Sequence, residues 1–227
     1  MLLVLFDIDG TILTDHGASR EAFHDALRDV FDYRGDLARY DFSGRTDPQI
    51  ARMVLADAGF EAAAIDERLH LLWDRYIEGL ARNAVPSRVE LMPGVRKLID
   101  ALASRDDVVL ALLTGNIEPG ARLKLAAPAL NDYFPFGAFG SDSADRNELP
   151  PVAMQRVRER TGVEIKGRDV VIIGDSIYDV RCGVPWESTT IAVATGKTPA
   201  ELLHKENPHH FFESLEDLEA VMRAIAG

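Results

Sequence analysis

The sequence contains one cysteine, no long hydrophobic run and no excess of basic residues. Cys182 alone cannot form an internal disulfide or a cysteine-rich zinc site, and this favours a reducing, cytoplasmic location. The longest apolar runs, Met1–Phe6 and Val108–Leu113, are far shorter than the roughly 20 residues that a membrane-spanning helix needs. We therefore expect a cytoplasmic protein that does not cross a membrane.

Acidic residues outnumber basic ones. The chain has 25 Lys and Arg against 37 Asp and Glu, which gives a formal net charge of −12. An excess of negative charge repels the phosphates of nucleic acids and of anionic membranes, so we expect neither as a partner. An anionic substrate would need a local cation in its site, either a bound metal ion or a few arginines.

Short apolar runs alternate with helical patterns over most of the 227 residues. Apolar runs separated by helices are typical of parallel strands that are buried on both faces. We predict an α/β fold with a Rossmann-like parallel sheet as its core. The predicted strands are Leu2–Phe6, Val108–Leu113, Val170–Ile173 and Ile191–Ala194, and the predicted core helices are Pro93–Ser104, Pro119–Ala127, Pro151–Thr161, Ile177–Val184 and Leu215–Ala226.

Residues 15–90 interrupt this alternation, because they contain no strand-like run. Helical spacing is visible instead over Ser19–Phe31, Pro48–Ala58 and Ala62–Ala84. We predict an all-helical cap domain at 15–90, inserted into an α/β core that is made of residues 1–14 and 91–227.

The first predicted strand leads into the segment Asp7-Ile8-Asp9-Gly10-Thr11. Side chains two residues apart on a strand share a face, so both carboxylates should leave the strand end together, and Gly10 permits a sharp turn after them. Ligands of open parallel sheets bind beyond this edge. Two close carboxylates repel each other unless they share a proton or bind a divalent cation, and Mg²⁺ suits an oxygen-only site.

Two other predicted strands end in matching polar groups. Thr114-Gly115-Asn116 offers an anion a hydroxyl, backbone N–H groups and an amide. Gly174-Asp175-Ser176 adds a third carboxylate, and Asp179 follows one helical turn later on the same face. Each motif alone is typical of a turn or a helix cap, but together they indicate a site at one edge of the sheet.

These motifs resemble those of the haloacid dehalogenase superfamily of phosphohydrolases, over nearly the whole chain. The resemblance implies that Asp7 is a nucleophile that forms an aspartyl phosphate and that Asp9 is the general acid and base. It also implies that Asp7, the backbone carbonyl of Asp9 and Asp175 hold Mg²⁺, with Asp179 as a further ligand or as the partner of a bound water. The residues expected at the phosphoryl group are the catalytic Thr114 and the substrate-binding Gly10, Thr11, Gly115 and Asn116.

One motif departs from the family pattern. The family usually has a lysine just before a helix that begins with proline, whereas this chain has Arg146 before Pro150-Pro151. We predict that Arg146 replaces the lysine as a catalytic residue, because a guanidinium stays charged and can bind two phosphoryl oxygens. The alternatives are that Arg146 is a solvated surface residue or that Lys124 or Lys166, which match no motif, supplies the charge.

The polar loop Phe42–Asp47 lies between predicted cap helices. In the resembling enzymes such a loop faces the active site, so Arg45 is a candidate for binding a second anionic group of the substrate. The alternative is that this loop caps the following helix, through Thr46 or Asp47 ahead of Pro48.

Asp9 and the absence of lysine from the predicted cap distinguish between the activities of this family. Dehalogenases lack the second aspartate of the first motif, so Asp9 argues against that reaction. Phosphonate cleavage needs a cap lysine, and no lysine occurs from Met1 to Arg96. We predict a Mg²⁺-dependent phosphatase, a phosphomonoesterase of a small phosphorylated metabolite such as phosphoglycolate. A sugar phosphomutase and a non-catalytic regulatory or binding module are the alternatives.

Overall fold

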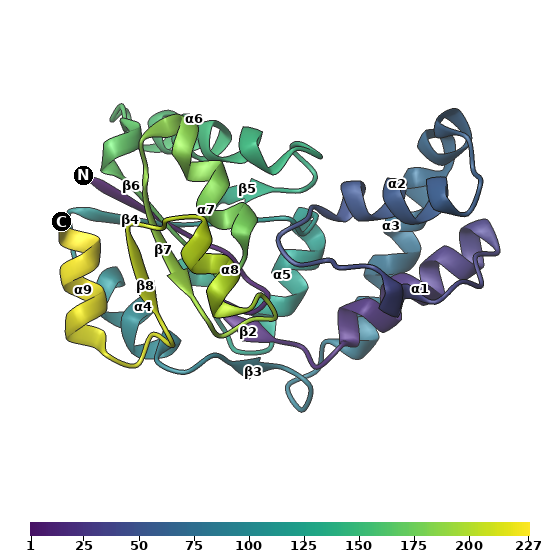
Figure 1. The fold of residues 1–227 in the computed structure, drawn as a ribbon, viewed down its shortest axis with the longest axis horizontal. Helices are drawn as coiled ribbons and strands as arrows, with labels where there is room; N and C mark the ends of the chain where they lie inside the picture. Colours follow the sequence, from purple (N-terminus) through teal and green to yellow (C-terminus); the bar gives the residue numbers. More distant parts are fainter.

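A six-stranded parallel sheet forms the core of the computed structural model, which describes residues 1–227 (Figure 1). The strand order is β5-β4-β1-β6-β7-β8, and every pair of neighbours runs parallel. The predicted α/β fold is therefore confirmed. The strands are β1 (Leu2–Phe6), β4 (Val108–Thr114), β5 (Gly137–Phe139), β6 (Val170–Gly174), β7 (Thr189–Val193) and β8 (His210–Phe212).

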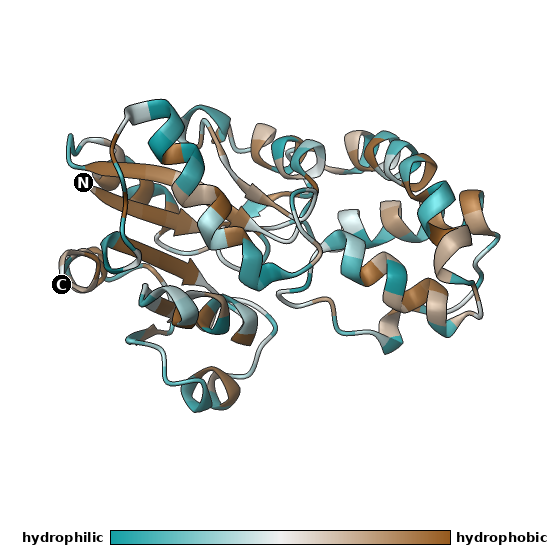
Figure 2. Cartoon of the chain, turned by 90° about the horizontal axis from the view of Figure 1, so that it is seen from above, coloured by the Kyte–Doolittle hydropathy of each residue, from teal (hydrophilic) through white to brown (hydrophobic).

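Helices cover both faces of the sheet, and the central strand β1 shows why. Val4 and Phe6 belong to one hydrophobic cluster, with residues of α4 (Val95–Ala103) and α9 (Leu218–Ala226). Leu3 and Leu5 belong to a second cluster, with residues of α6 (Leu149–Thr161). Figure 2 shows the apolar strands enclosed between helices whose outer sides are more hydrophilic. The core helices are α4 (Val95–Ala103), α5 (Glu118–Ala126), α6 (Leu149–Thr161), α7 (Ile177–Gly183), α8 (Ala200–Lys205) and α9 (Leu218–Ala226).

Three helices form a second unit, which we call the cap, at the end of the core away from both termini (Figure 1). They are α1 (Ala18–Phe31), α2 (Asp47–Asp57) and α3 (Ala62–Asn83). Fifteen buried cap residues and Ile117 of the core make a separate hydrophobic cluster, and Phe23 packs edge-on against Tyr76 within it. The cap thus has a hydrophobic core of its own.

The two chain segments that join the cap to the core lie side by side. β2 (Leu13–Thr14) and β3 (Glu90–Leu91) pair antiparallel, with Leu13 opposite Leu91 and Thr14 opposite Glu90. The sequence analysis identified neither strand, because two residues are too few to form an apolar run.

One predicted helix begins later than expected. The prediction starts at Leu215, whereas α9 starts at Leu218, because the Asp217 side chain accepts a hydrogen bond from the Ala220 N–H at 3.0 Å and caps the helix there. None of the helices combines the length and the apolar character needed to cross a membrane.

Candidate active site

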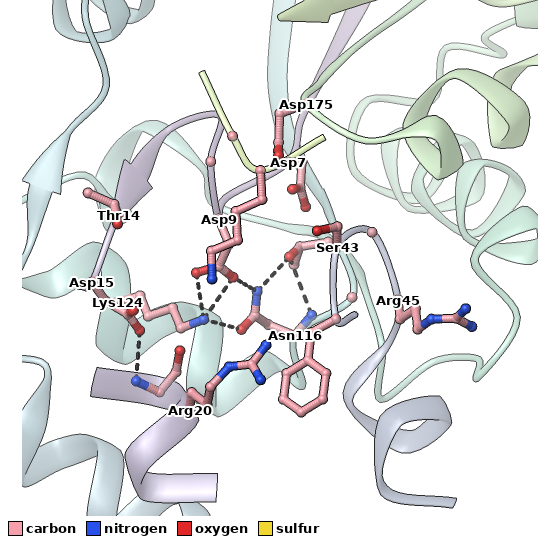
Figure 3. A pocket seen from close by; sticks show the side chains of 18 of the residues that line it. Asp7, Asp9, Thr14, Asp15, Arg20, Ser43, Arg45, Asn116, Lys124 and Asp175 are labelled. Atoms are coloured by element: carbon pink, nitrogen blue, oxygen red, sulfur yellow. Dashed lines mark hydrogen bonds and ion pairs between the residues drawn. The ribbon is translucent and has the colours of Figure 1, made fainter. Parts of the chain in front are cut away.

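The polar segments after β4, β1 and β6 lie next to one another, because these strands are neighbours in the sheet. Asp7 follows β1, Thr114 ends β4 and Asp175 follows β6. All three line a cavity of about 570 Å³ that lies between the core and the cap and is lined by residues of both. Figure 3 shows the side chains that converge there.

Asp7, Asp175 and Asp179 form a buried acidic cluster. Each has a carboxylate oxygen within 4.8 Å of those of the other two. Burial raises the pKa of Asp175 well above its usual value, and the neighbouring carboxylates of Asp7 and Asp179 add to the rise. The Thr11 hydroxyl donates to Asp175 Oδ1 at 3.0 Å. An oxygen-only cluster of this kind fits a divalent cation such as Mg²⁺, which would offset the mutual repulsion.

Arg146 lies against this cluster and is only 5% exposed. Its Nη2 donates to Asp7 Oδ1 at 2.9 Å and to the Leu113 carbonyl at 3.1 Å, and it also donates to Asp179. The Asp145 side chain caps the short 3-10 helix that carries Arg146, by accepting from the Asn147 N–H. Arg146 is therefore not a solvated surface residue.

Asp9 points to a different partner. Its carboxylate accepts hydrogen bonds from Lys124 Nζ at 2.8 and 2.7 Å and from Asn116 Nδ2 at 2.7 Å. Lys124 also donates to Asn116 Oδ1 at 2.7 Å, which fixes the orientation of the amide. The carboxylate of Asp9 is not part of the acidic cluster, so only its backbone carbonyl is left as a metal ligand from this residue.

The sequence analysis named Lys124 only as an alternative to Arg146 and did not predict its contact with Asp9. Lys124 is 2% exposed and lies on α5, in phase with the buried Ala121 and Leu125. A lysine on the apolar face of a helix is unusual, because a buried ammonium group needs a counter-charge. A lysine at a buried position of the helical pattern was therefore the sequence signal that could have identified Lys124 as a site residue. Lys166, the other lysine considered, is exposed at the start of a 3-10 helix and is not among the cavity residues.

Comparison with known proteins identifies the family. A family model for haloacid dehalogenase-like hydrolases matches residues 1–183. The chain belongs to this family. No curated protein matches the chain.

Solved structures share the fold of this haloacid dehalogenase-like hydrolase. A hydrolase from Pseudomonas syringae has a TM-score of 0.75 at 19% identity, with 100% of each chain covered. A predicted phosphoglycolate phosphatase from Haemophilus somnus has a TM-score of 0.71 at 16% identity, with 98% of each chain covered. A candidate β-phosphoglucomutase from Bacteroides vulgatus has a TM-score of 0.70 at 22% identity, covering 100% of this chain and 89% of its own.

Thr114 and Asn116 of the hydrolase are arranged together at the end of β4. The Thr114 hydroxyl accepts from the Asn116 N–H at 3.3 Å and from Asn116 Nδ2 at 2.8 Å. Both residues line the cavity, as do Gly10 and Gly115. Gly10 has a φ of +89°, and a Cβ atom there would collide with the Asp175 carboxylate. The expected substrate-binding segments thus reach the cavity.

Thr11 and Arg45 are placed differently from the other expected substrate-binding residues. Thr11 is fully buried, is absent from the cavity wall and uses its hydroxyl to donate to Asp175. Arg45 belongs to the cavity wall, but its Nε donates to the Asp41 carbonyl and its guanidinium lies 5.3 Å from the ring centre of Tyr178. Figure 3 shows the Arg45 side chain pointing away from the aspartates.

The loop that carries Arg45 also joins the cap to the core. Thr46 caps α2 by accepting from the Gln49 N–H, as the alternative interpretation predicted, and its hydroxyl donates to the Ala144 carbonyl of the core at 2.8 Å. Asp47 accepts from the Ile117 N–H at 2.9 Å, and burial raises the pKa of this aspartate to about 6. The loop thus closes one side of the cavity.

Proposed function

We propose that this hydrolase is a Mg²⁺-dependent phosphomonoesterase that acts on a small phosphorylated metabolite through an aspartyl phosphate on Asp7. The observation that supports this proposal most is the environment of Asp7. Its carboxylate is buried at the end of β1, beside the carboxylates of Asp175 and Asp179 and in contact with the guanidinium of Arg146. This arrangement brings one nucleophile, a set of metal ligands and a fixed positive charge to the same point.

We propose a separate task for each of these residues. Arg146 donates to Oδ1 of Asp7, and we propose that the other oxygen of this carboxylate attacks phosphorus. The bond from phosphorus to the leaving oxygen breaks as Asp9 gives that oxygen a proton. Asp9 then takes a proton from the water that attacks phosphorus, which releases phosphate and restores Asp7. Mg²⁺ held by Asp7, the Asp9 carbonyl, Asp175 and Asp179 would reduce the repulsion between carboxylate and phosphate.

Two groups are suited to bind the transferred phosphoryl oxygens. The Thr114 hydroxyl at the end of β4 accepts from Asn116 and keeps its own proton to donate, and the Arg146 guanidinium lies beside Asp7. Both Nδ2 hydrogens of Asn116 are donated to Asp9 and Thr114, so this amide positions those two side chains. Fixed donors that face developing negative charge provide most of the acceleration in phosphoryl transfer. We propose that Thr114 and Arg146 hold the phosphoryl group while Asp7 attacks it.

The size of the cavity supports a small substrate. A volume of about 570 Å³ between core and cap suits a metabolite and not a folded phosphoprotein. Phosphoglycolate-like compounds are the proposed class, and the similarity to the predicted phosphoglycolate phosphatase from Haemophilus somnus supports that choice at the level of fold.

A sugar phosphomutase is the second candidate, because the fold is also shared with the candidate β-phosphoglucomutase from Bacteroides vulgatus. This chain differs from phosphomutases that carry a histidine and a lysine in the cap loop, because it has Arg45 there and no lysine before Lys97. Incubation with β-glucose 1-phosphate separates the two activities, since a mutase yields glucose 6-phosphate and a phosphatase yields free phosphate.

Phosphate release from p-nitrophenyl phosphate tests the proposed function. We expect Mg²⁺-dependent release by the purified protein, and we expect Asp7→Asn to abolish it because an amide is not a nucleophile. Asp66→Asn is the matched control, since Asp66 is an exposed cap residue that pairs with Arg52. Absence of turnover over a wide panel of phosphomonoesters would instead favour the binding module.

A further inference from the structure

Arg20, in the first turns of α1, is a cavity residue that the proposed reaction does not use. We propose that Arg20 binds a second anionic group of the substrate, a carboxylate or a second phosphate, and thereby selects substrates that are charged at both ends. This inference rests on the proposed function and names the part of the cavity that recognises the leaving group.

Arg20 differs from the other buried cations of the cavity in having no carboxylate partner. Lys124 pairs with Asp9, and Arg146 pairs with Asp7 and Asp179. No carboxylate oxygen lies within 4.0 Å of a guanidinium nitrogen of Arg20. A half-buried guanidinium with no carboxylate in direct contact is incompletely compensated, and a ligand anion would add a direct counter-charge.

The contacts of Arg20 hold its guanidinium without neutralising it. Nη1 donates to the Leu37 carbonyl at 2.6 Å, and Nη2 donates to the Tyr40 carbonyl at 3.5 Å. The guanidinium carbon lies 4.0 Å from the ring centre of Phe42, which faces the same cavity. Two of the five N–H groups of the side chain are thus used, and the others are left for a ligand.

The position of Arg20 also suits binding of the leaving group. Figure 3 shows Arg20 on the side of the site where Lys124 and Asn116 hold Asp9, the proposed proton donor to the leaving oxygen. Arg45, in contrast, points toward Tyr178. Lys197 is the other cation of the cavity wall, and it is exposed on a loop of the core. Arg20 is therefore the cation best placed beside the leaving group.

Arg20 keeps its positive charge despite its partial burial. Desolvation lowers the pKa of the guanidinium, and the acidic Asp41 and Asp36 oppose this by their negative charge. Asp41 is exposed and accepts a hydrogen bond from the Ser43 N–H, so it does not occupy the free N–H groups of Arg20.

Three substrates that differ at one end test the inference. They are 2-phosphoglycolate, with a carboxylate, ethylene glycol bisphosphate, with a second phosphate, and 2-hydroxyethyl phosphate, which is uncharged at that end. We expect the wild-type enzyme to favour one or both of the charged substrates in kcat/KM. We expect Arg20→Ala to reduce this preference by about 10- to 100-fold, mainly through KM, and to change the uncharged substrate by less than about 3-fold.

Two further variants make this result specific to Arg20. Arg28→Ala removes the same charge from the same helix, where Arg28 pairs with Asp25 on the surface, and should leave all three substrates unchanged. Arg20→Lys keeps a positive charge and should restore part of the preference. An equal loss on all three substrates in Arg20→Ala, or no preference in the wild-type enzyme, would overturn the inference.

Calorimetric binding to Asp7→Asn in the presence of Mg²⁺ separates this inference from the proposed function. If the wild-type protein releases phosphate neither from these three compounds nor from the wider panel of phosphomonoesters, the phosphatase proposal fails. The inference still holds if Asp7→Asn binds a charged compound more tightly than 2-hydroxyethyl phosphate and if Arg20→Ala in that background removes the difference. Equal binding of all three compounds would overturn it.

Discussion

Lys124 donates hydrogen bonds to both carboxylate oxygens of Asp9, at 2.8 and 2.7 Å, across the base of the cavity. The two partners are buried to different degrees, since the Lys124 side chain is 2% exposed and the Asp9 side chain is 44% exposed. The ion pair is therefore asymmetric, because only the lysine depends on its partner for a counter-charge.

This asymmetry predicts unequal effects on stability. Asp9→Ala leaves a buried ammonium with only the more distant Asp15 and Asp47 near it, and should lower the free energy of unfolding by about 3 kcal/mol. Lys124→Met leaves a carboxylate that water can reach, and should cost less than about 1 kcal/mol. Urea unfolding of both variants measures the difference. Lys166→Met, on the surface, should change nothing, and equal losses in the first two variants would contradict the assignment.

Removal of Arg146 should stop catalysis. We expect Arg146→Ala to lower kcat by about 100-fold or more, because Asp7 and Asp179 lose the positive charge that they share and the phosphoryl group loses a donor. Arg146→Lys should keep part of the activity, since one ammonium cannot replace the planar fork of donors. Steady-state kinetics of both variants, with circular dichroism to check folding, provide the measurement. Near-normal turnover by Arg146→Ala would remove this residue from the site.

The acidic cluster predicts stabilisation by Mg²⁺. A ligand that binds only the folded state raises the melting temperature, by about 5 °C or more at a 100-fold excess over Kd. Asp175→Asn should lose this shift, because it removes one of the three buried carboxylates. Asp66→Asn should retain it, since Asp66 lies on the cap surface. A shift that persists in Asp175→Asn would place the ion elsewhere.

Cys182 should be unreactive in the folded protein. Burial raises the pKa of its thiol to about 12, so at about pH 8 the thiol is protonated as well as inaccessible. Titration with a chromogenic disulfide reagent should label the native protein at least about 100-fold more slowly than the protein in guanidinium chloride. Rapid labelling of the native state would show that α7 opens readily.

The close contact between the loop Phe42–Asp47 and the core requires a glycine at position 115. A Cβ atom at Gly115 would collide with the carbonyl oxygen of Arg45, so Gly115→Ala should push the loop away from the core. We expect kcat/KM to fall by about 10- to 100-fold, because small displacements of positioning groups are costly. Gly120→Ala is the matched control, since its Cβ would meet nothing closer than 3.6 Å. Equal activity of the two variants would show that this contact is not required.

The sequence predicted the central strands and their polar ends well, because both signals are local. Leu2–Phe6 is a continuous apolar run, and the change to Asp7 marks its end with little ambiguity. β5, with only Gly137–Phe139, escaped notice because three residues do not establish a pattern. Its burial depends on the neighbouring strand β4, which no local signal reveals.

The side-chain partners in the site were harder to predict than its location. The loop position of Arg45 follows from the sequence, but its direction is decided by Tyr178 and by the carbonyl of Asp41. The contact between Lys124 and Asp9 joins residues 115 positions apart and requires the packing of α5 beside β1 to be known. Long-range contacts of this kind decide which of several cations reaches which carboxylate.

The pairing of β2 with β3 means that the chain leaves the sheet domain and returns to it at adjacent points, with Leu13 opposite Leu91. A short reverse turn would be enough to bridge these two residues. The helical insertion therefore enters and leaves the core at one place and does not interrupt the order of the six strands. Under the proposed function, the phosphoryl chemistry and the recognition of the leaving group would belong to two units of one chain, each with its own hydrophobic cluster.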